Sequence, residues 1–67
     1  MDIASIIDGA GVPVAELARR VGVSDGHLFD IKSGRRRLTV EIAGRLEVAT
    51  GRRGIVDWVV QQRLQAA

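Results

Sequence analysis

The chain carries, at residues 14–33, the segment VAELARRVGVSDGHLFDIKS. Apolar residues recur at helical spacing on both sides of Gly22, which predicts two helices joined by a turn of three or four residues. Ala18 is small enough for the second helix to lie close over the first, and Gly22 can adopt the left-handed conformation that ends the first helix. We expect Leu28 and Ile31 to hold the second helix against the core.

Outside this segment the chain also consists of short helical pieces separated by glycine. Asp2, Ser24 and Thr39 precede three of these pieces and can accept hydrogen bonds from their free amides. The expected helices are Asp2 to about Ala10, Pro13 to Val21, Ser24 to about Ser33, Val40 to about Ala49, and about Ile55 to Gln65. Alternation with a period of two residues is nearly absent, so the sequence predicts an all-α fold, a compact five-helix domain over residues 1–67.

The composition excludes several classes of protein. The chain has 67 residues, of which 46% are hydrophobic and 27% charged, as in an ordinary globular domain. It has no cysteine and a single histidine, so we expect no disulfide, metal, cofactor or catalytic residue, and no enzyme activity. No apolar run approaches the ~20 residues of a membrane span, and the first residues lack a basic region before an apolar core, so we expect no secretion signal. We therefore expect a cytoplasmic protein without a membrane partner.

The basic residues are more informative than the net charge of +2. Nine of the ten are arginine, whose guanidinium forks suit phosphate oxygens and guanine edges. Three of them, Arg35, Arg36 and Arg37, stand together just after the expected third helix. An arginine-rich genome would also contribute to this count.

Three motifs resemble the Cro and repressor family of phage and bacterial helix-turn-helix regulators. They are the Leu-Ala-x-x-Val-Gly-Val-Ser block at residues 17–24, the helix end and basic loop at residues 31–36, and Val-Asp-Trp at residues 56–58. The resemblance covers nearly the whole chain. It implies a lambda repressor-like five-helix domain that binds a palindromic operator in double-stranded DNA as a homodimer, in the bacterial cytoplasm or nucleoid, and a phage or prophage origin.

In such proteins the outward face of the second helix of the pair enters the major groove. With Leu28 and Ile31 pointing inward, the opposite face carries base-reading candidates, while Ser24 and the arginines lie where they can meet phosphates. The predicted DNA-binding residues are Ser24, Asp25, Gly26, His27, Phe29, Asp30, Lys32, Ser33, Arg35, Arg36 and Arg37.

Two features depart from the family. Many relatives have a phosphate-binding glutamine at the position of Val14, which valine cannot replace. Asp25 and Asp30 are acidic on a face expected to meet DNA, where an aspartate is repelled unless it accepts from cytosine or orients an arginine. Asp25 is therefore either a helix-capping partner or a base contact. Asp30 either reads cytosine or forms a salt bridge with Arg35 or Arg36.

Several side chains have two interpretations. Phe29 either packs in the core or is partly exposed and rests on a thymine methyl group, and we favour exposure. His27 either contacts phosphate or lies idle in solvent. Trp58 is expected in the core. In the last helix Val59, Val60 and Leu64 are more apolar than packing needs, so part of that stripe is a candidate dimer surface.

Two other functions fit the same scaffold. A helical protein-interaction module without DNA binding is one, although such a module has no need of Arg35–Arg37 beside the recognition helix. An autorepressing antitoxin is the other, and the neighbouring gene would distinguish it from a phage Cro or repressor. No small-molecule ligand is expected.

Overall fold

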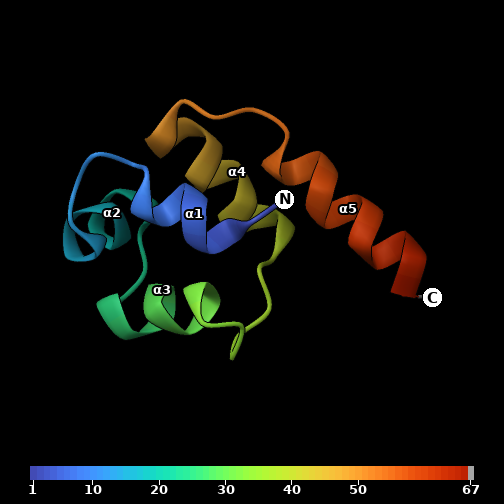
Figure 1. Cartoon of the computed structure of the whole chain (residues 1–67), viewed down its shortest axis with the longest axis horizontal. Helices are drawn as coiled ribbons and strands as arrows, with labels where there is room; N and C mark the ends of the chain where they lie inside the picture. The colour runs from blue at the N-terminus through green and yellow to red at the C-terminus, as the bar shows by residue number, and fades with distance from the viewer. Residues whose placement is uncertain (67) are drawn as a thin grey trace.

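The computed structural model describes residues 1–66, which form five α-helices (Figure 1). The helices are α1 (Ile3–Asp8), α2 (Val14–Val21), α3 (Asp25–Lys32), α4 (Val40–Thr50) and α5 (Ile55–Ala66). The described residues contain no strand. The predicted all-α, five-helix architecture is therefore confirmed.

The helix starts follow from local hydrogen bonding. The side chains of Asp2, Ser24 and Thr39 each accept a hydrogen bond from the backbone amide three residues later, as predicted for N-caps. At Asp2 the Ser5 hydroxyl donates a second bond, 2.8 Å long, to the same carboxylate. The hydrogen bonds from the Ser5 side chain and amide hold the pKa of Asp2 below its usual value. The first helix ends at Asp8, slightly earlier than predicted.

The turn between α2 and α3 depends on a glycine. Gly22 has a φ of 87°, a left-handed conformation that side chains other than glycine adopt at a cost. A Cβ atom at this position would also lie 3.0 Å from a guanidinium nitrogen of Arg45. That Arg45 group donates a 3.2 Å hydrogen bond to the Val21 carbonyl, one of the free carbonyls at the end of α2.

One hydrophobic core joins the five helices. Its buried residues are Ile6, Ile7, Leu17, Ala18, Val21, Leu28, Ile31, Leu38, Ile42, Ala43, Leu46, Ile55 and Val59. Both Ile42 and Ala43 of α4 are inside. Val59 is core too, so of the apolar stripe on the last helix only Val60 and Leu64 remain exposed. Trp58 is half-buried and packs against this core.

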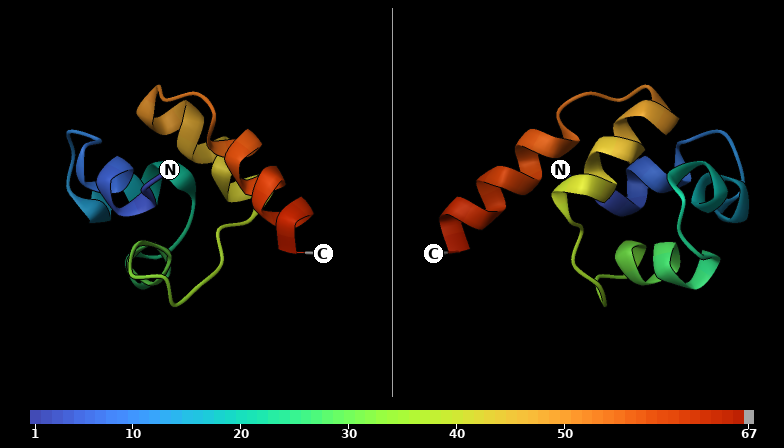
Figure 2. Two further views of the ribbon diagram at one scale, coloured as in Figure 1. Left: turned by 45° about the vertical axis from the view of Figure 1, so that its right-hand side comes forward. Right: turned by 180° about the vertical axis from the view of Figure 1, so that it is seen from behind.

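The last helix packs on α4 and then extends away from the other helices (Figure 2). Ile55 and Val59 are buried in its first half, whereas residues 60–65 are exposed. Gly54 precedes α5 and has no side chain to cap it. Instead, the Glu47 carboxylate of α4 accepts a 2.7 Å hydrogen bond from the Val56 amide in the first turn. Within residues 1–66 no helix has the length and apolar character needed to cross a membrane.

Candidate nucleic-acid interface

The third helix lies at the outside of the bundle, with one face against the core and the other in solvent (Figure 1). Leu28 and Ile31 are 0% and 5% exposed and face inward. The connecting turn is held by backbone hydrogen bonds, because the Gly22 and Val23 amides both donate to the Ala18 carbonyl, at 2.8 and 3.0 Å. The orientation of α3 on the domain is therefore set by packing and by the turn.

Most of the predicted DNA-binding residues share the outward side of α3 and its two ends. Those that are exposed are Ser24, Asp25, Gly26, Phe29, Ser33, Arg35, Arg36 and Arg37; His27 and Asp30 are half-buried. Ser24 also serves as N-cap, accepting a 3.1 Å bond from the His27 amide. We call the outward side of α3 at residues 25, 26, 29, 30 and 33 the recognition face.

Phe29 is 51% exposed, so the interpretation that places it in the core is wrong. Its neighbour Leu28 points the other way and is fully buried. The Lys32 ammonium lies 5.9 Å from the centre of the Phe29 ring, at the outer limit of a cation–π contact. An aromatic ring is thus presented to solvent at the middle of the recognition face.

Asp30 joins the following loop through its backbone. Its carbonyl accepts from the amides of Arg35 and Arg36, at 2.8 and 3.1 Å, and from the Ser33 hydroxyl at 3.3 Å. Within residues 1–66 the Asp30 carboxylate forms no ion pair with either arginine, so the salt-bridge interpretation is wrong. The carboxylate remains available on the recognition face.

Lys32 points back toward the body of the domain. Its ammonium lies 2.6 Å from a carboxylate oxygen of Asp8, so it ties the end of α3 to α1. The structure thus gives Lys32 an internal partner, and its contact with DNA stays a prediction.

Arg35, Arg36 and Arg37 form the basic loop between α3 and α4. Gly34, with a φ of 83°, turns the chain out of α3, and buried Leu38 ties the far end of the loop to the core. All three arginines are exposed, and among the described residues none of them pairs with an acidic side chain. The arginines of α2 and α4 differ in this respect: Arg19 and Arg20 pair with Glu16, and Arg45 pairs with Glu41.

Two side chains of α4 stabilise the ends of other helices in a way that the sequence did not predict. Arg45 caps the end of α2, and Glu47 caps the start of α5. The i, i+4 spacing of Glu41 and Arg45 signals their ion pair, but neither capping bond has a signal in the sequence, because each joins two different helices. In the part of the chain that is described, no group of three or more histidine, aspartate or glutamate residues is placed to hold a metal ion.

Comparison with known proteins agrees with this geometry. A family model described as Helix-turn-helix matches residues 3–56, from the start of α1 into the first turn of α5. Neither the curated proteins nor the solved structures included a match to the chain. The family match covers well over half of the sequence, including both helices of the pair, the turn between them and the basic loop. The chain therefore belongs to the lambda repressor-like helix-turn-helix family of DNA-binding transcription regulators.

Proposed function

We propose that the protein is a Cro-like repressor that binds a specific operator in double-stranded DNA, with α3 in the major groove. The observation that carries this proposal is the continuity of the recognition face with the basic loop. An exposed helix face of suitable size for the groove runs directly into three arginines without acidic partners in the described part of the chain. The acidic residues that do pair with arginines, Glu16 and Glu41, lie elsewhere, on α2 and α4.

Under this proposal the two parts have different roles. Phe29 and Asp30 contact base edges: the ring meets a thymine methyl group, and the carboxylate accepts from a cytosine amine. The Ser24 end of α3 offers backbone amides to a phosphate, and the basic loop follows the sugar-phosphate backbone. Base contacts then supply specificity, while phosphate contacts supply most of the affinity for any duplex.

The salt dependence of DNA binding tests this division. Each neutralised phosphate adds about 0.9 to the slope of log affinity against log salt concentration. Changing Arg35→Gln and Arg36→Gln together should lower that slope by up to about 2 and weaken operator and random duplex alike. The matched control is Arg52→Gln with Arg53→Gln, which removes the same charge from the exposed loop before α5, on the opposite side of the domain from α3 (Figure 1).

The control pair should leave the slope nearly unchanged. Equal slopes in both double variants would contradict the role of the basic loop. Failure of the unmodified protein to bind any duplex, even at low salt, would favour the protein-interaction module instead.

We also propose that two copies bind one palindromic operator through contacts between their α5 helices. Val60 and Leu64 lie one turn apart on this helix and are 37% and 67% exposed. A second recognition helix about 34 Å away would double the length of DNA that is read.

Sedimentation of the complex with operator DNA measures the number of chains per site. Val60→Ser with Leu64→Ser should reduce two chains to one. The same changes at the exposed neighbours Gln61 and Gln65 should not. One chain per operator in the unmodified protein would refute the dimer.

A further inference from the structure

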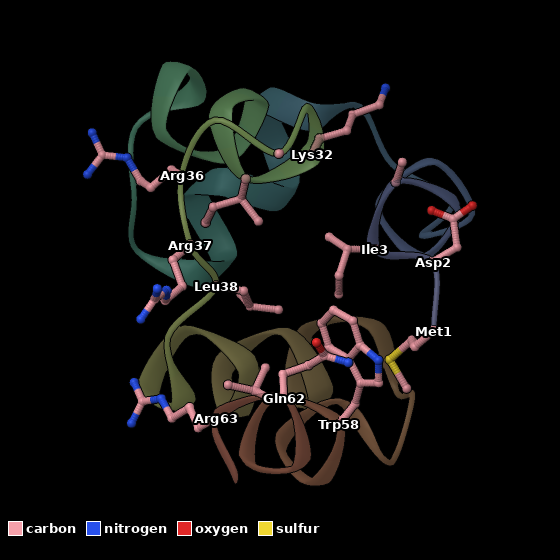
Figure 3. A pocket seen from close by; sticks show the side chains of 14 residues that line it. Met1, Asp2, Ile3, Lys32, Arg36, Arg37, Leu38, Trp58, Gln62 and Arg63 are labelled. Carbon is pink, nitrogen blue, oxygen red and sulfur yellow. The ribbon is translucent and has the colours of Figure 1, made fainter. Parts of the chain in front are cut away.

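A groove opens beside the basic loop, between the start of α1, the end of α3 with the loop after it, and the face of α5 (Figure 3). Its volume is about 450 Å³, within the range of roughly 300–1,000 Å³ that small-molecule sites occupy. The recognition face lies elsewhere: of its residues 25, 26, 29, 30 and 33, none lines the groove.

The floor of the groove is apolar. It is formed by Ile3, Ile31, Leu38, Trp58 and Val59, which come from four different segments of the chain. The Trp58 ring points into the space toward Ile3 (Figure 3). A half-buried indole beside aliphatic side chains favours an apolar group of a ligand, because both surfaces are then removed from water.

One edge of the groove is cationic. Arg36 and Arg37 of the basic loop and Arg63 of α5 lie along the same edge (Figure 3). Among the described residues none of these three forms an ion pair. Asp2 is the one acidic residue in the lining, and its carboxylate already accepts both hydrogen bonds from Ser5. The edge therefore carries uncompensated positive charge.

We propose that this groove binds a small amphipathic anion, a medium-length carboxylate whose apolar chain lies against Trp58 and Ile3. Its carboxylate would form charge-assisted hydrogen bonds with Arg37 and Arg63 at the edge. There the carboxylate also stays partly exposed to water. A second copy that placed its own α5 in this groove would fit less well. Its Arg63 would bring positive charge against the positive edge of the groove.

Binding of such an anion has a consequence for DNA that rests on the proposed function. Arg36 and Arg37 belong both to the groove edge and to the basic loop. A carboxylate held there neutralises charge that otherwise meets phosphates, so the ligand and the duplex compete. The groove then acts as an effector site for the regulator.

The chain provides its own reporter for the ligand site. Trp58 is the only tryptophan and there is no tyrosine, so intrinsic fluorescence reports on the groove directly. Without DNA present, titration with octanoate should give a saturable change in Trp58 emission. The affinity for octanoate should exceed that for octanol by about three- to five-fold, as expected for an exposed ion pair. It should exceed the affinity for octylamine by a larger factor.

Matched variants separate the charged edge from non-specific apolar binding. Arg37→Gln with Arg63→Gln should lower the octanoate affinity to that of octanol, while Arg52→Gln with Arg53→Gln should leave it unchanged. A linear, non-saturating signal, equal affinities for octanoate and octanol, or unchanged octanoate binding in the edge variant would each overturn the site. Far-UV circular dichroism at each ligand concentration verifies that the helices remain folded.

The competition is measured separately, on a labelled duplex. Octanoate should weaken DNA binding by the unmodified protein, and the effect should be smaller in Arg63→Gln, which removes a groove residue outside the proposed DNA interface. An equal effect in both proteins would overturn the competition. Absence of DNA binding without octanoate would refute the proposed function and leave the fluorescence result as the test of the groove.

Discussion

Truncation of Phe29 to alanine separates the roles of two neighbouring side chains on α3. Full burial of a phenylalanine side chain is worth about 1.5–3 kcal/mol. Because Phe29 is 51% exposed, its truncation should lose about half of that burial free energy. Loss of the contact with Lys32 at 5.9 Å adds roughly 0.5 kcal/mol. The expected loss of unfolding free energy is therefore about 1–2 kcal/mol. The matched change Leu28→Ala, at a fully buried position, should cost about 2–5 kcal/mol.

Thermal melting followed by circular dichroism compares the two variants. In a domain of this size, 1 kcal/mol corresponds to roughly 4–8 °C in melting temperature. Phe29→Ala should therefore remain folded at 25 °C with a moderately lowered melting temperature. Leu28→Ala should melt far lower or be largely unfolded, since small domains have little stability to lose.

The same variant tests base recognition. If the ring meets a base, its loss should weaken binding to an operator selected from a random pool by about five-fold or more. Binding to random duplex should be nearly unchanged, because phosphate contacts remain. Fluorescence anisotropy with both duplexes measures the ratio. Equal losses on both duplexes, or a melting temperature as low as that of Leu28→Ala, would refute the assignment of Phe29 to the recognition face.

Three further variants test other parts of the structure. Asp30→Ala should bind random duplex as well or better, because a negative charge leaves the DNA side, while preference at one base pair disappears; weaker binding to random duplex would contradict this. Glu47→Ala should lose about 0.5–2 kcal/mol of stability, as for other lost helix caps, with faster amide exchange in the first turn of α5; unchanged exchange would argue against the cap. Gly22→Ala should melt lower than Gly34→Ala, because both positions have positive φ but only the first adds a contact at 3.0 Å with Arg45; equal melting temperatures would refute that contact.

The helices themselves were predictable because the signals that define them are local. A capping side chain acts on an amide three residues away, and Ser24 and Thr39 marked the starts of α3 and α4 correctly. The glycines that separate the helical pieces are local signals as well: Gly22 and Gly51 adopt positive φ directly after the last residues of α2 and α4. Apolar spacing within one helix likewise placed Leu28 and Ile31 in the core.

Where local signals allowed two answers, the packing of helices chose one. The sequence left Phe29 open between core and solvent, and in the packed domain its ring is 51% exposed while Leu28 beside it is buried. The Asp30 carboxylate was a candidate partner for the arginines, but the loop after Gly34 instead brings their backbone amides to the Asp30 carbonyl. Val59 is buried because α5 lies on α4 with that residue facing inward.

Contacts between segments far apart in the chain had no sequence signal at all. Lys32 meets Asp8, Arg45 meets the Val21 carbonyl, and Glu47 caps α5, each across two helices. The groove under α5 exists only because Trp58 lies opposite the start of α1 and the basic loop. Spacing along the chain specifies which residues share a helix face, but the distance between two faces depends on the helix crossing angles, which are set by the packing of the whole core.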